Sequence, residues 1–208
     1  MIYHNNNLFI HITKTGGSSI RRYIEQCGKM PPNPFAVPPF MHYTLQDIYD
    51  RRNSLKIDFD NIEKIIIMIR NPYDRIFSLY HFYKQTLVNQ GLRRELPNIY
   101  NYIHLEFNQW LIQLEKEDAY YHWYDYDRYI TINGKIPENL KIFKFERFNT
   151  ALRSIVKLFG LEFKENLEVP HIFKTKHPKF ARVYDRNSYD IINRMLPWAF
   201  DKGSYQQK

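Results

Sequence analysis

The feature that most restricts the fold is a short apolar run at residues 65–69 (IIIMI), which is followed almost at once by a helix-start signal. Such a short and continuously apolar run is typical of a strand that is buried on both faces. The helix signal is Asn71-Pro72-Tyr73-Asp74, with a capping side chain, a proline suited to the first helical position and an acid in the first turn. A buried strand that leads directly into a helix favours an α/β fold.

The rest of the chain alternates between the same two patterns. Short apolar runs predict further strands at residues 8–12 and 140–145. Apolar residues at helical spacing predict helices at residues 18–27, 71–83, 103–114 and 149–159, and a last helix that starts near residue 188. Gly28 and Gly160 stand where C-terminal caps belong, and Asn149 stands where an N-terminal cap belongs. We therefore predict an α/β fold with a central, mostly parallel sheet flanked by helices.

Two segments do not fit this alternation. Residues 30–40 carry five prolines and are predicted to be an extended loop, and the polar residues 84–98 are predicted to be a surface connection. Neither segment is typical of a domain linker, and no internal repeat is visible. Because 208 residues suit one domain, we expect residues 1–208 to form a single domain.

The charge of the chain restricts its partners. The net charge is +8, from 30 Lys and Arg against 22 Asp and Glu, which favours a nucleic acid, a membrane surface, a polyanionic sugar or a phosphorylated cofactor. The chain has no RNP motif, no zinc-finger spacing and no long basic block, so we expect no nucleic acid partner. The histidines also show no spacing that argues for a metal, and we expect no metal site.

The sequence also restricts disulfide formation and membrane insertion. Cys27 is the only cysteine in the sequence, so no intrachain disulfide can form. The first residues, MIYHNNNLFI, lack the basic and long apolar segments of a signal peptide. The longest strongly apolar run is far too short to span a bilayer. We therefore expect a soluble, intracellular chain without a membrane span.

The first motif that carries chemistry lies between the predicted strand at 8–12 and the predicted helix at 18–27, and it reads Lys14-Thr15-Gly16-Gly17-Ser18-Ser19. A strand, a glycine-containing loop and a helix aim backbone N–H groups and the positive end of the helix at one point, which suits a phosphate. The glycines would let the backbone approach a ligand closely, the serines can donate to phosphate oxygens, and the lysine supplies positive charge. An ordinary capped strand-to-helix turn would have a similar sequence.

The second motif begins where the apolar run ends. Arg70 leaves the predicted strand, and Ser78 lies two turns along the following helix. In an α/β sheet the carboxyl ends of parallel strands gather at one edge, where ligands bind, so we expect Arg70 to lie beside the first motif. A guanidinium can hold two phosphate oxygens at once. The alternative is that Arg70 forms a surface ion pair, for example with Asp74.

Together, the two motifs resemble those of sulfotransferases that use 3′-phosphoadenosine 5′-phosphosulfate (PAPS), specifically the carbohydrate (Golgi-type, family 2) branch. Further segments resemble the same family, at residues 41–44, 144–149, 170–171 and 200–205, so the similarity covers nearly the whole chain. One departure is Thr13, where the family usually has proline. The resemblance implies a P-loop-containing nucleotide hydrolase-like, three-layer fold and a PAPS-dependent sulfotransferase of class EC 2.8.2. The product of the donor would be adenosine 3′,5′-bisphosphate, and the acceptor would be a hydroxyl, most simply on a carbohydrate.

The resemblance also assigns roles to residues. The 5′-phosphosulfate would be bound by the first motif, residues Lys14, Thr15, Gly16, Gly17, Ser18 and Ser19, and the 3′-phosphate by Arg70 and Ser78. Luminal members of the family carry a membrane anchor and often cysteines, which this chain lacks. Its similarity is therefore to a trimmed, cytoplasmic enzyme from a bacterium or a virus-infected cell.

Sulfuryl transfer needs charge stabilisation at the leaving group and a base for the acceptor hydroxyl. We expect Lys14 to be the electrostatic catalyst and His42 to be the base, because a histidine has a suitable pKa and the family resemblance places one in this region. His122, in an aromatic cluster, and Glu146 are alternative bases, and His42 could instead only hydrogen-bond a loop. His11, which alternates with Ile10 and Ile12, is predicted to be a buried core residue.

Two other classes of function remain open. A small P-loop-like kinase would require Mg²⁺ and a lysine after the second glycine, whereas Lys14 precedes both glycines. A non-catalytic protein that binds polyanions would show steep salt dependence and no specific need for Lys14. The sequence does not determine the acceptor or the oligomeric state, because the fold of an enzyme does not fix its substrate.

Overall fold

The computed structural model describes residues 1–27, 42–87, 102–116, 126–170 and 178–208. The chain divides into two compact units. The first unit combines Met1–Ile69 with Tyr126–Ile172, and the second combines Arg70–Asp125 with Phe173–Lys208. The predicted single domain over residues 1–208 stays a prediction.

The first unit is built on a four-stranded sheet with the order β1-β2-β3-β4. Its strands are β1 (Ile2–His4), β2 (Asn7–Ile10), β3 (Lys64–Ile69) and β4 (Leu140–Lys144). Strands β1 and β2 are antiparallel, and their short turn places Asn5 and Asn6 at positive φ, as tight hairpins require. The β2–β3 and β3–β4 pairs are parallel, with Phe9 opposite Ile66 and Ile67 opposite Ile142.

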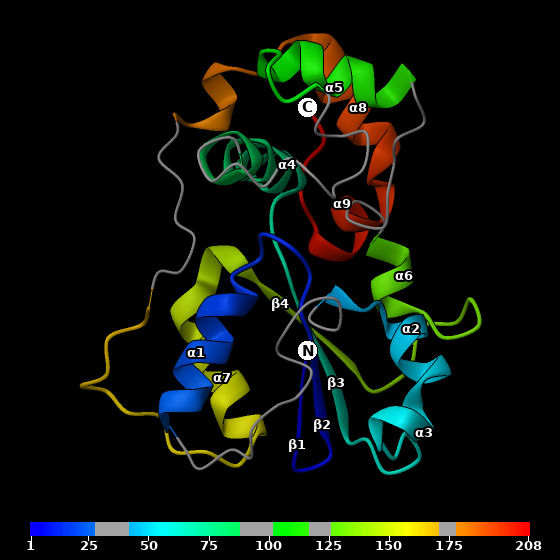
Figure 1. Ribbon diagram of the computed structural model, residues 1–208, viewed down its shortest axis with the longest axis vertical. Helices are drawn as coiled ribbons and strands as arrows, with labels where there is room; N and C mark the ends of the chain where they lie inside the picture. The colour runs from blue at the N-terminus through cyan, green and yellow to red at the C-terminus, as the bar shows by residue number, and fades with distance from the viewer. Residues whose placement is uncertain (28–41, 88–101, 117–125, 171–177) are drawn as a thin grey trace. The chain divides into compact units, whose positions relative to one another are not determined.

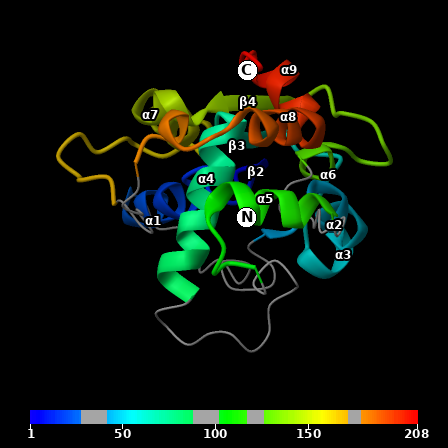
Figure 2. The same ribbon diagram turned by 90° about the horizontal axis from the view of Figure 1, so that it is seen from above.

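Helices cover both faces of this sheet. Helices α1 (Gly17–Cys27) and α7 (Phe148–Leu158) lie together on one side, and α2 (Leu45–Asp50), α3 (Arg52–Leu55) and α6 (Tyr126–Ile130) lie on the other (Figures 1 and 2). Phe9, Ile66 and Met68 of the sheet share one apolar cluster with α1 and α7. The first unit is therefore a three-layer α/β structure with a mostly parallel sheet, and this confirms the predicted fold class.

The second unit is helical. It contains α4 (Pro72–Phe82), which continues into a π-helical segment (Tyr83–Leu87), and α5 (Phe107–Lys116), α8 (Arg186–Met195) and α9 (Pro197–Gly203). A short 3₁₀ turn (Phe180–Arg182) precedes α8. Its core is rich in aromatic side chains that meet edge to face or at a tilt, among them Tyr73, Phe77, Tyr80, Phe107, Trp110 and Tyr184. The high aromatic content of the chain is used here for packing.

Most predicted elements are present, with corrected ends. The predicted strand at 8–12 stops at Ile10, and the helix predicted from residue 103 begins at Phe107, because Ile103 lies in a preceding turn. Asn149 is not the N-cap of α7, since the helix already begins at Phe148. The helix predicted to start near residue 188 is α8, which begins at Arg186, and Asp185 caps it by accepting a hydrogen bond from the Ser188 N–H. It is not the last helix, because α9 follows it.

Some predictions fall wholly or partly outside the described residues. These are the loop at 30–40, the cap at Gly28, residues 88–98 of the predicted connection, and His122. The part of that connection that is described, 84–87, belongs to the π-helical segment that continues α4.

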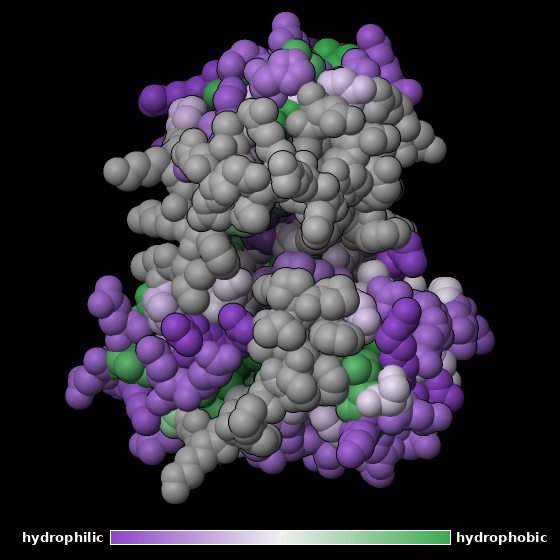
Figure 3. Space-filling model, viewed as in Figure 1, coloured by the Kyte–Doolittle hydropathy of each residue, from purple (hydrophilic) through white to green (hydrophobic). Residues whose placement is uncertain are grey.

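The surface agrees with a chain that buries its apolar residues. The visible face is largely hydrophilic around α2 and α3 (Figure 3). Within the described residues, Ile136 is the only large hydrophobic side chain that is exposed. None of the helices in those residues is long and apolar enough to cross a membrane.

Candidate active site

The first motif forms a compact turn in the first unit. After β2, residues 13–16 form the turn, and α1 begins at Gly17. Lys14 has a φ of 60° and Gly16 a φ of 84°, so two residues of the turn are left-handed. The Thr15 hydroxyl donates a 2.7 Å hydrogen bond to the Ile12 carbonyl oxygen, and Thr15 is fully buried. The Thr15 side chain therefore stabilises the turn itself.

The start of α1 gives this turn its electrostatic character. The N–H groups in the first turn of an α-helix have no acceptor within the helix, and the helix dipole places partial positive charge there. Ser18 is partly exposed at this end, Ser19 is buried, and Lys14 is half-buried just before it. All six residues of the first motif thus lie at one helix N-terminus, an arrangement that suits an anion.

The two glycines are required by packing as well as by the turn. A Cβ atom at Gly16 would lie 2.6 Å from Cε2 of Phe148, and one at Gly17 would lie 2.5 Å from Nε2 and 2.6 Å from Cγ of His11. Real Cβ atoms essentially never come within 3.0 Å of such neighbours. The sequence suggested close approach of a ligand as the reason for these glycines, and the structure adds close approach of two rings.

Replacing Gly17 with alanine is therefore expected to destabilise the protein by about 1–3 kcal/mol, the usual cost of overpacking a well-packed site. The measurement is urea unfolding of the purified variant, followed by circular dichroism. The double variant Gly17→Ala/His11→Ala is the matched control, because without the imidazole the added methyl group has room. If Gly17→Ala costs as much in the His11→Ala background as in the wild type, the contact between the two residues is not the cause.

His11 and His42 form a contact pair next to this turn. Their ring centroids are 4.7 Å apart and their planes are tilted by 50°. Nδ1 of His42 lies 3.4 Å from the backbone carbonyl oxygen of His11. His11 is only 7% exposed, as the sequence predicted for a buried residue, although it lies just beyond the end of β2 rather than on a strand.

Burial lowers the pKa of both histidines. It is the main reason that the pKa of His42 is lowered to about 4, and the hydrogen bond to the His11 carbonyl only partly opposes it. The pKa of His11 is lowered well below its ordinary value, first by burial and then by the neighbouring His42, the Met1 amino group, Arg21 and Lys14. Both imidazoles are therefore neutral near pH 7.

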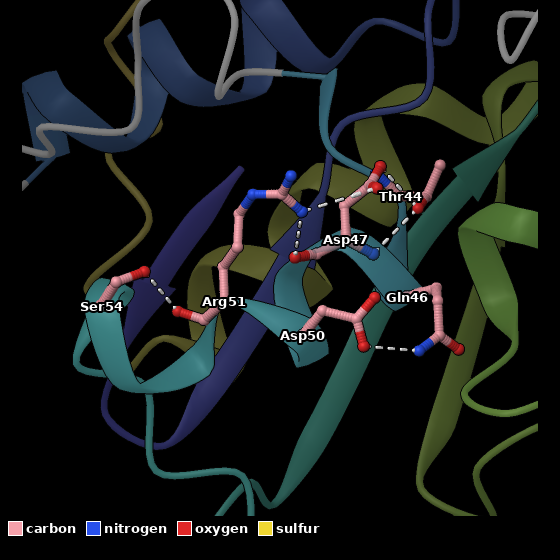
Figure 4. Close-up of polar contacts among 6 residues, drawn as sticks. All are labelled: Thr44, Gln46, Asp47, Asp50, Arg51 and Ser54. Carbon is pink, nitrogen blue, oxygen red and sulfur yellow. Dashed lines mark hydrogen bonds and ion pairs between the residues drawn. The ribbon is translucent and has the colours of Figure 1, made fainter.

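The segment that carries His42 is fixed by the start of α2. Thr44 caps this helix, and its hydroxyl oxygen accepts a 3.0 Å hydrogen bond from the Asp47 N–H. The Asp47 carboxylate in turn accepts 3.0 Å and 2.7 Å hydrogen bonds from the Thr44 N–H and hydroxyl (Figure 4). These reciprocal bonds form a capping box. Asp47 also forms an ion pair with Arg51, and the Ser54 hydroxyl donates a hydrogen bond to the Arg51 carbonyl oxygen (Figure 4).

The lowered pKa of His42 predicts a pH-dependent stability. The unfolded chain takes up a proton at this residue as the pH falls through about 6.5, whereas the folded chain does so only near pH 4. The contribution of neutral His42 to the free energy of unfolding is therefore fully present above pH 6.5. It is lost as the pH falls from 6.5 to 4, and the loss from His42 alone is about 3 kcal/mol.

Urea unfolding at several pH values would measure this loss, with His42→Gln as the comparison, because carboxyl groups titrate alike in both proteins. Between pH 6.5 and 4, we expect the free energy of unfolding of His42→Gln to fall less steeply than that of the wild type. The difference between the two slopes should be about 1.4 kcal/mol per pH unit. Parallel curves for the two proteins would show that His42 does not titrate as its burial requires.

The second motif lies in the second unit, at the start of α4. Asn71 caps this helix by accepting hydrogen bonds from the Tyr73 and Asp74 N–H groups, and Pro72 is its first residue, both as predicted. Arg70 donates from Nε and from Nη2 to the same oxygen of Asp74, at 2.7 Å each. The structure therefore shows the ion pair that the sequence left open as an alternative.

Ser78 follows Asp74 by four residues, so these two side chains lie on one face of α4, whereas Arg70 precedes the helix and pairs with Asp74 in its first turn. Ser78 is buried, and the Arg70 side chain is 12% exposed. The role of Arg70 and Ser78 as phosphate ligands stays a prediction.

Glu146 is the alternative base that lies within the described residues. Glu146 is exposed in a 3₁₀ turn (Phe145–Arg147) between β4 and α7. In the described ranges, no three His, Cys, Asp or Glu side chains gather as metal ligands would. The sequence did not reveal that His11 contacts both Gly17 and His42, because His42 lies 31 residues away along the chain and the contact with Gly17 depends on the shape of the intervening turn.

Comparison with known proteins shows the family. The model of the sulfotransferase family matches residues 3–189, so this chain belongs to the sulfotransferase family, whose members are transferases of EC 2.8.2 type. Among solved structures, a sulfotransferase from Alicyclobacillus acidocaldarius is similar, with 18% sequence identity and a TM-score of 0.44 over 94% of this chain and 97% of that chain. Comparison with curated proteins gave no significant match.

Proposed function

We propose that this chain transfers a sulfuryl group from PAPS to a hydroxyl group, with a carbohydrate as the acceptor. The observation that carries the donor is the turn at residues 13–16, where Lys14 and the N-terminus of α1 concentrate positive charge in the manner of a phosphate site. Arg70, just before α4, and Ser78, within α4, would supply a guanidinium and a hydroxyl group for a second phosphate. Family membership supports sulfuryl transfer as the chemistry.

The proposed reaction forms one bond to sulfur and breaks another. The oxygen of the acceptor hydroxyl forms a bond to sulfur, the bond between sulfur and the bridging phosphate oxygen breaks, and the hydroxyl proton leaves to a base. Negative charge develops on the bridging oxygen, and in our proposal it is stabilised by the Lys14 ammonium group and by the first-turn N–H groups of α1. These donors belong to a fixed turn, so little reorganisation is needed when the charge forms.

For the proton we propose His42 as the acceptor. Its Nδ1 faces the His11 carbonyl oxygen, which leaves Nε2 as the nitrogen that can take a proton. The low pKa keeps the ring neutral, and a bound anionic donor would raise this pKa toward neutrality, where a base is most effective. A pH–rate comparison of His42→Ala, Glu146→Gln and His122→Ala separates the three bases, since only the true base shifts the acidic limb.

The experiment that tests the donor is calorimetric titration with adenosine 3′,5′-bisphosphate, ATP and AMP. We expect the bisphosphate to bind at least tenfold more tightly than AMP, because two charge-assisted contacts to the 3′-phosphate are added. Equal or stronger binding of ATP, with dependence on Mg²⁺, would favour the kinase. Weak binding of all three with steep salt dependence would favour a polyanion-binding protein. A bisphosphate-binding result justifies a screen of hydroxyl acceptors with labelled PAPS.

A further inference from the structure

We infer that His11 is a positioning residue, whose ring and carbonyl group fix the orientation of His42 beside the first turn of α1. The inference rests on the proposed function, in which His42 accepts the proton of the acceptor hydroxyl. His11 itself does not act on the substrate in this account. It connects the helix start at Gly17 with the proposed base.

The ring of His11 has two partners on different segments. It packs against the His42 ring at 4.7 Å between centroids, and it fills the space where a Cβ of Gly17 would stand. Because Gly17 is the first residue of α1, the His11 ring contacts both the phosphate-type turn and the proposed base. The His11 ring therefore connects these two segments by direct contacts.

The carbonyl group of His11 selects the tautomer of His42. A carbonyl oxygen can only accept, so the 3.4 Å contact is favourable only when Nδ1 of His42 carries the hydrogen. Neutral His42 then has its lone pair on Nε2, as a base requires. The packed ring of His11 opposes rotation of His42 away from this carbonyl group.

The charges around the pair favour the same state. Positive charge on Arg21 and Lys14 lowers the pKa of His11, whereas the pKa of the buried Met1 amino group is itself lowered to about 5, so this group is neutral near pH 7. The positive charge together with burial disfavours an imidazolium ion on His11, and burial does so on His42. A neutral His11 is also the form that can pack closely against a neutral His42.

The test is nitrogen NMR of the protein labelled with ¹⁵N-histidine, with the His42 signals assigned by their loss in His42→Gln. In the wild type at pH 7 we expect a protonated Nδ1 and an unprotonated Nε2 at His42. In His11→Ala we expect a mixture of tautomers and a higher pKa for His42, because water replaces the ring. His11→Phe, which keeps a planar ring, is expected to restore the single tautomer, and His104→Gln, at an exposed site in the second unit, is the matched control.

Two outcomes would overturn the inference. One is an Nε2–H tautomer for His42 in the wild type, a result that needs no variant to fold. The other is an unchanged tautomer and pKa of His42 in His11→Ala, which would leave His11 as a core residue only. If His11→Ala lowers stability but not the tautomer preference, its role is likewise structural.

Kinetics and binding separate this inference from the proposed function. With labelled PAPS and a hydroxyl acceptor from the screen, His11→Ala is expected to lower kcat about tenfold with little change in the KM for the donor, as loss of an orienting partner does. Failure of the wild type to bind the bisphosphate would remove the proposed function and leave the tautomer result standing. Normal binding together with the wrong tautomer would remove only the role of His11.

Discussion

Replacing Lys14 with alanine is expected to lower kcat by about 10²–10³-fold at saturating PAPS, with a smaller effect on the KM for the donor. The reason is that charge on the bridging oxygen develops mainly in the transition state, so a cation that stabilises it contributes more there than in the bound ground state. The measurement is initial-rate kinetics with labelled PAPS and an acceptor from the screen. Near-normal turnover in Lys14→Ala would exclude the role that we assign to this residue.

The chain offers a close control for this variant. Lys56 is exposed, lies in the same unit, and has a φ of 53° at the C-terminal end of α3, so it shares the left-handed backbone of Lys14. Lys56→Ala therefore repeats the loss of one charge and the strain of alanine at positive φ, away from α1, and its kcat should equal that of the wild type. Lys14→Asn adds a second comparison, because asparagine tolerates a left-handed backbone but carries no charge.

The elements that the sequence predicted well are those with local signals. The β3–α4 junction was predicted because an apolar run and the cap at Asn71 are both readable over a few residues, and the structure shows both. The turn before α1 was also predicted as a unit, since glycines between a strand and an amphipathic helix restrict the backbone there. The exact end of β2 was not, because Ile12 is buried whether or not it pairs in the sheet.

Other elements lacked such signals or were misread. Strand β1 has only three residues and no apolar run, and α2 has six residues, too few to show a helical period. The Thr44–Asp47 capping box was a readable sign of α2 that was missed. At α7, the 3₁₀ turn at Phe145–Arg147 leads directly into the helix, so the helix begins before Asn149 can cap it.

The candidate site could be predicted only as far as neighbours along the chain determine it. The first motif is continuous in sequence, so its residues had to lie together. The contact between His11 and His42 depends instead on how the segment before α2 packs against the end of β2, which no local pattern reports. The Arg70–Asp74 pair lies between these cases, because a side chain just before a helix can reach the first helical turn without being required to do so.

Replacing Arg70 with alanine is expected to lower the affinity for adenosine 3′,5′-bisphosphate by about 10²-fold, while the affinity for AMP changes little. The loss corresponds to about 2–3 kcal/mol for charge-assisted hydrogen bonds to a phosphate. AMP lacks the 3′-phosphate, so in the variant the two ligands should bind with nearly equal affinity. Calorimetric titration of both ligands into both proteins measures this difference directly.

Asp74 supplies the control for this experiment. Nε and Nη2 of Arg70 both donate to one oxygen of Asp74, so a phosphate that uses these donors has to compete with this carboxylate. Asp74→Asn removes the negative charge while keeping the shape of the side chain, and we expect bisphosphate affinity to be unchanged or to rise a few-fold. If Arg70→Ala weakens the binding of AMP as much as the binding of the bisphosphate, Arg70 acts through the structure of α4. If Asp74→Asn also abolishes binding, the ion pair itself is required to form the site.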